Sequence, residues 1–393
     1  MDLLLKNLSW HDGFHLLLGD IRIQRHLITE IGSTLQPKKN EQIFDFKNHF
    51  LYPGLINSHD HLEMNLYPKL GTPPFNNYVE WANDIYKPAQ SPLLEIQKVD
   101  IRDRLMWGGL KNLVSGVTTV IHHNPWHSLL GKRKFPVKVL KNFAWAHSLQ
   151  FEKDILKCYP RKINTPFIIH GAEGKDEFAF SEIAELDRLG LLKSNTVIVH
   201  AIAVREGDIE LLANSDSSVV WCPASNLFMF EMTAPIQELK NKIKVALGTD
   251  STLTGSSTLL DEIKVAAKTN LADARGIYNM VSSIPVEIFG LPEVNIAPNQ
   301  IADLFIAPIK ANDYFENLQT LDPADMAMVL IQGEIRLLDV KFENKNSMTK
   351  NSVTIQGRHK KTDIDIAALK SRIEKKVGSK ILNQNPLWVL LEV

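Results

Sequence analysis

Residues 51–61, LYPGLINSHDH, combine a short apolar run with a pair of histidines at its end. A short apolar run beside Pro53-Gly54 is typical of a strand that is buried on both faces of a parallel sheet. Residues two apart in a strand project to the same side, so His59 and His61 project together and can share one metal ion. Taken alone, the pattern fits two surface histidines in a loop equally well.

Apolar runs of this kind recur along the chain and alternate with helical stretches. The runs are residues 116–123 (GVTTVIHH), 166–171 (PFIIHG), 196–200 (TVIVH), 217–222 (SSVVWC) and 243–250 (IKVALGTD), with amphipathic stretches such as 180–192 and 259–268 between them. The last four runs end near residues 170, 200, 221 and 250, and steps of 30, 21 and 29 residues are typical of βα units. The sequence therefore predicts an α/β fold, a (β/α)8 TIM-type barrel.

One part of the barrel is expected to be distorted. The 48 residues between His122 and His170 have to hold three βα units, which is too few for complete ones. We therefore expect strands three and four of the barrel to be abbreviated or to lose a helix.

The two chain ends consist of short strands and turns and differ in texture from the barrel. Residues 1–52 and 303–345 are predicted to pair into a small β-sandwich domain, which leaves residues 53–302 for the barrel. Residues 346–393 form a polar tail with a helix-like stretch at 366–381, and the sequence assigns this tail no role.

Residues that can bind a metal ion stand at the ends of several predicted strands. His170, His200 and Asp250 each close an apolar run. A single residue of this kind is usually a hydrogen-bonded core residue or a helix cap, but the carboxyl ends of barrel strands converge on one face. With His59 and His61, they predict a shell of nitrogen and oxygen ligands for one divalent ion. Zn²⁺ is the expected ion, and Fe²⁺ and Mn²⁺ are the alternatives.

The segments around these residues together resemble the amidohydrolase superfamily of metal-dependent hydrolases. They are LYPGLINSHDH, GVTTV, FIIHGAEG, IVHAIAV, VVWCPASN, VALGTDS and NQIADLFI, and they occur in the family's order over about residues 50–305. The resemblance implies that His59 and His61 ligate the metal from the first barrel strand, His170 from the fifth and Asp250 from the eighth. It also implies that His200 lies beside the metal or the substrate.

The segment HGAE, with Glu173 three residues after His170, resembles the deaminase and chlorohydrolase branch of the family, which binds one metal. The resemblance implies three catalytic residues. Glu173 shuttles protons, Asp250 takes a proton from the attacking water, and His200 assists. The alternative for Glu173 is a loop carboxylate at a helix N-terminus. A two-metal site needs a bridging lysine on the fourth strand, and no lysine of that region ends an apolar run.

Five more residues are candidates for the substrate pocket because of their positions. They are His122 and His123 after the second predicted strand, His147 in FAWAHSL, and Ser225 and Asn226 in CPASN. The three histidines could instead be hydrogen-bonded supports, and one of them could join the metal shell. The alternative for Ser225 and Asn226 is an ordinary turn.

The long segment 61–107 is rich in aromatic residues, namely Tyr67, Phe75, Tyr78, Trp81 and Tyr86. Long loops in compact domains are often functional, so this segment is predicted to cover the barrel mouth. The alternative is a contact between two copies of the chain, because exposed aromatic residues also mark interfaces. We expect a homodimer or a higher homo-oligomer.

Composition excludes several other classes of protein. The 393 residues include 44 Lys and Arg against 45 Asp and Glu, and a net charge of −1 argues against nucleic acid or an anionic membrane as partner. Two cysteines, Cys158 and Cys222, exclude a disulfide framework. No secretory signal or membrane span is recognisable, so we expect a cytoplasmic protein with a small molecule as its partner.

Together these features predict a metal-dependent hydrolase that cleaves a non-peptide carbon–nitrogen bond, by hydrolytic deamination of a heterocyclic or amidine-type small molecule. One alternative is a hydrolase with the same metal site that opens a cyclic amide or removes a halide. Another is a non-catalytic barrel that serves as a scaffold, although such proteins usually lose metal ligands.

Overall fold

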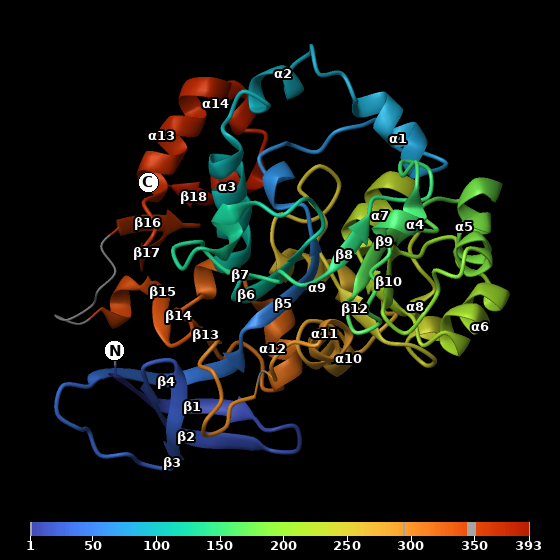
Figure 1. Cartoon of the computed structure of the whole chain (residues 1–393). Coiled ribbons are helices and arrows are strands. Elements are labelled where there is room, and N and C mark those ends of the chain that lie inside the picture. Colours follow the sequence, from blue (N-terminus) through green and yellow to red (C-terminus); the bar gives the residue numbers. More distant parts are fainter. Residues whose placement is uncertain (1, 294, 344–350, 393) are drawn as a thin grey trace.

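The computed structural model describes residues 2–293, 295–343 and 351–392. Within these residues, eight parallel strands form a barrel from two sheets (Figure 1). The strands are β5 (Leu55–Asp60), β6 (Val117–His122), β7 (Lys138–Val139), β8 (Ala144–Ala146), β9 (Phe167–Gly171), β10 (Thr196–His200), β11 (Ser218–Trp221) and β12 (Val245–Leu247). The sheet orders are β5-β6-β7 and β12-β11-β10-β9-β8. A hydrogen bond from the Asp250 amide to the His59 carbonyl (3.1 Å) joins the two sheets.

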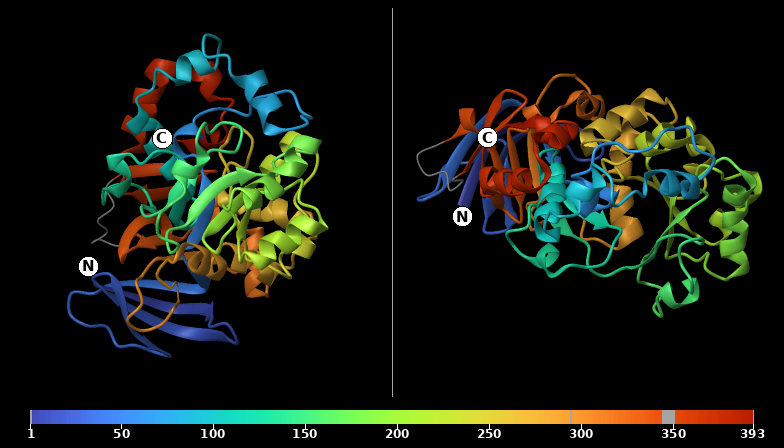
Figure 2. Two further views of the ribbon diagram at one scale, coloured as in Figure 1. Left: turned by 45° about the vertical axis from the view of Figure 1, so that its right-hand side comes forward. Right: turned by 90° about the horizontal axis from the view of Figure 1, so that it is seen from above.

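Helices lie on the outer side of the barrel strands (Figure 2). They include α3 (Ile101–Leu113), α5 (Glu177–Arg188), α6 (Glu206–Asn214), α9 (Leu259–Lys268), α10 (Ala274–Met280) and α11 (Ser283–Phe289). In α5, Asp176 caps the N-terminus by accepting from the Ala179 amide, and Ile183 and Leu186 are fully buried. The strands β6, β9, β10 and β11 are buried along their whole length, as expected of strands covered on both faces. The predicted TIM-type α/β fold is confirmed.

The barrel is distorted between its second and fifth strands. β7 has two residues and β8 has three, and residues 140–143 between them form no helix. The predicted abbreviation of strands three and four is therefore confirmed. Lys138 of β7 forms an ion pair with Asp303, so it is engaged outside the barrel mouth.

Strands from both chain ends form a further sheet, which has ten strands. Its members are β1 (Asp2–His11), β2 (Leu16–Gln24), β3 (Leu27–Gly32), β4 (Gln42–Pro53), β13 (Leu304–Pro308), β14 (Met328–Ile331), β15 (Glu334–Asp339), β16 (Asn351–Ile355), β17 (Arg358–Thr362) and β18 (Leu391–Glu392). The antiparallel pair β4–β13 joins the strands of the N-terminal end to those of the C-terminal end. A closed sandwich and the predicted domain limits stay predictions, and the limit at 345/346 lies outside the described residues.

The C-terminal tail packs back on the barrel. It forms α13 (Ile366–Val377), α14 (Ser379–Leu382) and α15 (Pro386–Leu390), which cover the helix-like stretch of the sequence. Trp388 packs on Trp107 of α3 with ring centroids 5.3 Å apart, and Asn385 donates to the Asn65 carbonyl (2.9 Å) behind the end of β5. The tail thus supports the loop that follows the first barrel strand. In the described part of the chain, no helix is long and apolar enough to cross a membrane.

Candidate metal centre and active site

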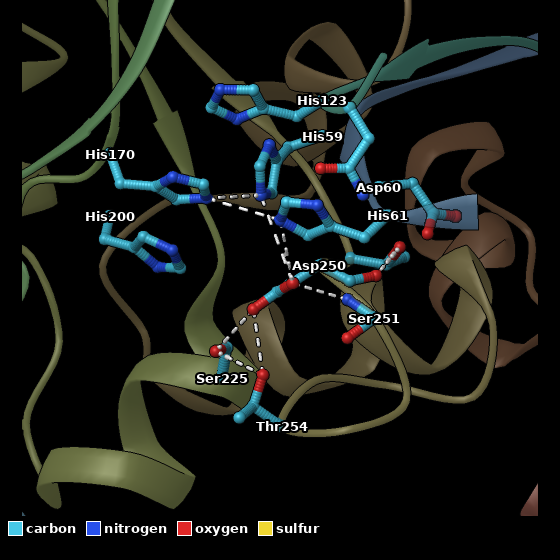
Figure 3. Close-up of polar contacts among 12 residues, drawn as sticks. His59, Asp60, His61, His123, His170, His200, Ser225, Asp250, Ser251 and Thr254 are labelled. Carbon is cyan, nitrogen blue, oxygen red and sulfur yellow. Dashed lines mark hydrogen bonds and ion pairs between the residues drawn. The ribbon is translucent and has the colours of Figure 1, made fainter. Parts of the chain in front are cut away.

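Three imidazole rings converge at the carboxyl ends of the barrel strands (Figure 3). His59 lies in β5, His61 directly follows it, and His170 lies in β9. The Nε2 atom of His170 lies 3.3 Å from the Nε2 atoms of both His59 and His61. All three side chains are buried. The period of two along β5 thus brings its histidines to one point, as the sequence predicts.

These distances fit a single metal ion. Two nitrogens at about 2.0–2.1 Å from a tetrahedral Zn²⁺ lie about 3.4 Å apart. Burial and neighbouring histidines lower the pKa of both His59 and His170 well below the usual value, which favours the neutral form that binds metals. His170 Nδ1 donates to the His147 carbonyl (2.7 Å), which leaves its Nε2 lone pair free. The Nδ1 atoms of His59 and His61 have no hydrogen-bond partner among the described residues.

Asp250 turns one carboxylate oxygen toward this cluster and anchors the other. Its Oδ1 lies 3.8 Å from His61 Nε2 and 4.0 Å from His59 Nε2. Its Oδ2 accepts hydrogen bonds from the hydroxyls of Ser225 (2.9 Å) and Thr254 (2.8 Å). Burial by itself raises the pKa of Asp250, but His61, His200 and the hydrogen bonds from the Thr254 hydroxyl and the Ser251 amide outweigh it and lower the pKa below the usual value. The carboxylate is therefore charged and fixed, as a metal ligand or a proton acceptor requires.

Glu173 and His200 lie together beside the cluster. Glu173 Oε1 is 3.5 Å from His200 Nε2. His200 Nδ1 donates to Asn226 Oδ1 (2.9 Å), so the His200 Nε2 atom carries the lone pair. Burial, followed by the charges of Asp250 and Glu182, raises the pKa of Glu173 well above the usual value. A protonated Glu173 can therefore donate to His200 or to a substrate nitrogen.

His123 is a fourth histidine of this cluster. One candidate ligand atom from each of His59, His61, His123 and His170 lies within 4.8 Å of the other three. The His123 ring stacks on His170, with centroids 4.3 Å apart and planes inclined by 14°. The His61 ring is inclined to His170 by the same 14°, so stacking does not distinguish His123 from a ligand. His123 Nε2 donates to the Ala146 carbonyl (2.9 Å). Because His59, His61, His170 and Asp250 already offer the four ligands of a tetrahedral site, we expect His123 to support this shell.

Behind the cluster lies a buried ionic network that sequence reasoning missed. Lys111 of α3 has no exposed surface and lies 3.4 Å from Asp60 Oδ2. Its Nζ atom donates to Asn65 Oδ1 (2.9 Å), Thr249 Oγ1 (2.9 Å) and the Asp250 carbonyl (2.7 Å). The network therefore connects β5 to Asp250, the residue that faces His59 and His61. The one sequence signal was Asp60, an acidic residue between two histidines at the end of a buried strand.

A cavity of about 110 Å³ lies next to the cluster, against α1 (Tyr78–Ile85). The predicted site residues that line it are His61, His147, His170, Glu173, His200 and Asp250. A larger cavity of about 550 Å³, lined by His11 and Arg275 among others, contains none of the predicted site residues.

Four residues predicted for the substrate pocket do not line this cavity: His122, His123, Ser225 and Asn226. They hold other groups in place. His122 Nε2 faces Glu63 Oε2 (3.6 Å), and its Nδ1 atom accepts from the Leu62 amide (3.3 Å). His123, Ser225 and Asn226 contact Ala146, Asp250 and His200, as described above. The four side chains thus lie behind the wall of this cavity, and their role at the substrate stays a prediction.

The predicted cover of the barrel mouth is partly observed. Tyr78 and Trp81 line the cavity, and Phe75 is buried near them in one apolar cluster with Tyr78. Tyr86 is 73% exposed and lies outside the cavity lining. The first half of the aromatic segment therefore contributes to the pocket. Tyr86 does not, and for this residue a contact between two copies of the chain stays a prediction.

A sequence profile of the amidohydrolase family matches residues 132–336, just over half of the chain. The chain belongs to the amidohydrolase family. The profile spans β7 to β14 and includes His170, Glu173, His200 and Asp250. The predicted family is thus confirmed, as is the prediction of a metal-dependent hydrolase that acts on carbon–nitrogen bonds. The family and the histidine cluster also indicate a divalent metal site.

Several curated proteins resemble this amidohydrolase along most of its length. A 5-methylthioadenosine/S-adenosylhomocysteine deaminase of Pyrococcus furiosus is 24% identical, and the match covers 88% of this chain and 97% of the relative. A 5′-deoxyadenosine deaminase of Methanothrix thermoacetophila is 25% identical, over 72% of this chain and 80% of the relative.

Solved structures share the fold. An adenosine deaminase from Xanthomonas campestris with bound zinc superposes with a TM-score of 0.72 at 18% identity, covering 95% of this chain and 97% of that one. A guanine deaminase from C. acetobutylicum with bound guanine has a TM-score of 0.64 at 17% identity, covering 85% of this chain and all of that one. At such identities the likeness concerns the fold.

Proposed function

We propose that this amidohydrolase deaminates a heterocyclic small molecule by hydrolysis at a single Zn²⁺ ion. One observation carries the proposal: Glu173 lines the same cavity as His61 and His170, whose Nε2 atoms converge. Glu173 is buried there, and its pKa is raised. The deaminase names of the curated relatives support the reaction, and the zinc in the adenosine deaminase structure supports the choice of ion.

The residues that would hold the ion are His59, His61, His170 and Asp250, whose facing atoms lie 3.3–4.0 Å apart. Three nitrogens and one oxygen suit zinc and leave room for a further ligand. When bound, the ion would lower the pKa of a coordinated water toward neutrality and so supply the nucleophile.

The side chains around the cavity move the protons of the reaction. Asp250 accepts a proton from the attacking water, because its carboxylate is charged and held by Ser225 and Thr254. Glu173 donates its proton to a ring nitrogen, which makes the carbon that bears the amine more electrophilic. His200, 3.5 Å from Glu173, accepts a hydrogen bond from the protonated carboxyl and so orients it.

The products follow from the balance of atoms. The water oxygen bonds to the ring carbon, and the two protons of the water pass through Asp250 and Glu173. The carbon–nitrogen bond breaks once the amine has received a proton, so ammonia leaves and a ring carbonyl remains.

The finer predictions on organisation also remain proposals. We propose a homodimer or higher homo-oligomer in the cytoplasm, and a sandwich domain of residues 1–52 and 303–345 beside a barrel of residues 53–302. The pairing of β4 with β13 supports a shared domain of both chain ends.

Ammonia release from a panel of aminated purines, pyrimidines and triazines tests the reaction directly. We expect release from at least one of them by zinc-loaded protein, with one oxygen from ¹⁸O-labelled water in the ring product. Release of chloride from a chlorinated ring, or opening of a cyclic amide without ammonia, would place the protein with the alternative hydrolases.

A further inference from the structure

We propose that the substrate is an uncharged ring of about the size of a single nucleobase, carrying the amine but neither a sugar nor a phosphate. This inference rests on the proposed deamination and names its substrate class. It departs from the curated relatives, which are deaminases of adenosine derivatives by name. Three properties of the cavity beside Glu173 carry it: its volume, its fixed roof and its charge.

The cavity is small. Its volume of about 110 Å³ lies well below the roughly 300–1,000 Å³ of common ligand pockets. A planar ring with an exocyclic amine fits such a space, whereas a ring joined to a sugar does not. Met64, Tyr78, Trp81, Phe151 and Met229 form its apolar walls, which suit the faces of a planar ring.

The roof of the cavity, residues 70–82, is bonded to the loop that carries Glu173. The Tyr78 amide donates to the Glu173 carbonyl (3.2 Å), and the Tyr78 hydroxyl donates to Glu182 of α5 (3.1 Å). Asn77 forms an isolated β-bridge with Gly174 in the same loop. The roof therefore has a defined position above the reacting groups.

The same roof is bonded to the loops after two further barrel strands. The Phe75 amide donates to the Met229 carbonyl (2.8 Å) after β11, and the Leu70 amide donates to the Leu253 carbonyl (3.0 Å) after β12. The Trp81 indole donates to the Leu70 carbonyl (3.1 Å), so the side chain that closes the cavity is itself held. Main-chain bonds to the segments after three barrel strands therefore set the height of the roof and limit the space above the reacting groups.

The charge of the lining excludes anionic substrates. Among the described residues the cavity lining contains the carboxyls of Glu173 and Asp250 and no lysine or arginine. Phosphate and carboxylate groups are generally recognised by Arg, Lys or a helix N-terminus. The lining offers a phosphate no lysine or arginine side chain and places the charged Asp250 beside it, so the site favours a neutral ring.

Matched pairs of substrates test the inference: adenine with adenosine and its 5′-phosphate, guanine with guanosine, and cytosine with cytidine. We expect kcat/KM for the preferred base to exceed that of its nucleoside by about 100-fold or more, with no turnover of the nucleotide. A nucleoside deaminated as well as its base overturns the inference and leaves the proposed reaction standing. If no compound releases ammonia, the proposed reaction fails and the inference falls with it.

Variants of the roof make the test independent of the identity of the base. We expect Trp81→Ala to narrow the preference for base over nucleoside about tenfold, since it removes the side chain that closes the cavity. Phe151→Ala, a 44% exposed wall residue, tests the same point if the first variant does not fold. Tyr86→Ala, in the same segment but outside the cavity, is the control and should leave the preference unchanged. An unchanged preference in both wall variants contradicts a size limit set by these walls.

Discussion

The Nζ atom of Lys111 lies 3.4 Å from Oδ2 of Asp60, and both side chains are fully buried. Asp60 stands between His59 and His61, and Lys111 also donates to the main chain of Asp250. The ion pair therefore lies directly behind the atoms that would hold the metal, and connects the first barrel strand to the end of the last. Buried lysines are rare unless they are paired, so this one is expected to be required by the site.

Replacement of Lys111 should destabilise the protein strongly. Lys111→Met leaves the charge of Asp60 buried without its partner, and we expect a loss of about 3–5 kcal/mol in the free energy of unfolding. Urea denaturation of the metal-free protein measures it. The double variant Lys111→Met/Asp60→Asn should recover part of the loss, and Lys98→Met, at an exposed lysine, should change little. A loss below about 1 kcal/mol in the single variant would show that the pair is dispensable.

His123 should affect metal binding without being a ligand. Its Nε2 atom donates to the Ala146 carbonyl, so its buried Nδ1 atom is an acceptor, and the ring lies 5.1 Å from that of His59, whose Nδ1 atom also lacks a partner. We expect His123→Leu to weaken zinc binding about 10–100-fold in a chelator competition assay, as for other outer partners of metal-bound histidines.

Cobalt substitution separates this supporting role from direct ligation. The visible spectrum of the Co²⁺ form should keep its shape in His123→Leu if the ligands are unchanged. A changed coordination number would make His123 a ligand, and unchanged zinc affinity would deny it any role. His127→Leu, in the same segment, is the matched control.

Glu182 should make stability depend on pH. Burial raises the pKa of this carboxyl to about 7, although Tyr78 and the Ala172 amide donate to it. Between the ordinary pKa and pH 7 the unfolded chain releases the proton while the native protein keeps it, so native stability falls as pH rises and levels off above pH 7. Between pH 5 and pH 8 we expect the free energy of unfolding of Glu182→Gln to rise by about 2–3 kcal/mol relative to that of the wild type. A difference that does not vary with pH would contradict the raised pKa.

The strand ends that carry the site could be predicted because each closes a continuous apolar run. His170 and His200 stand at the ends of β9 and β10 as the spacing indicates. The short strands β7 and β8 could not be placed, because two or three residues carry no periodicity. The tail strands β16 and β17 were missed because their sequences, NSVTI and RHKKT, are mostly polar.

The residues behind the metal-binding side chains were harder to predict than the metal-binding side chains themselves. Ser225 and Asn226 were expected at the substrate, but their side chains face Asp250 and His200. Lys111 belongs to a helix whose sequence, IRDRLMWGGLKNL, gives no reason to bury a lysine. Such positions depend on which turn of a helix packs against which strand end, and sequence periodicity alone does not specify that.

Glu173→Gln should separate catalysis from metal binding. Glutamine preserves the shape of the side chain but cannot donate and recover a proton, so we expect kcat for ammonia release to fall about 10²–10⁴-fold. Metal content should stay at the wild-type level, because Glu173 is not among the converging ligands. Glu177→Gln, at an exposed carboxyl four residues away, is the control. Activity close to that of the wild type would remove Glu173 from the proton path.

The dependence of ammonia release on bound metal is the most direct test of the proposed chemistry. Protein stripped with a chelator should release no ammonia from its substrate, and activity should return linearly with added Zn²⁺ and reach its plateau at one equivalent per chain. Ammonia release by metal-free protein at the original rate, or a plateau that needs two equivalents, would contradict a single-metal deaminase.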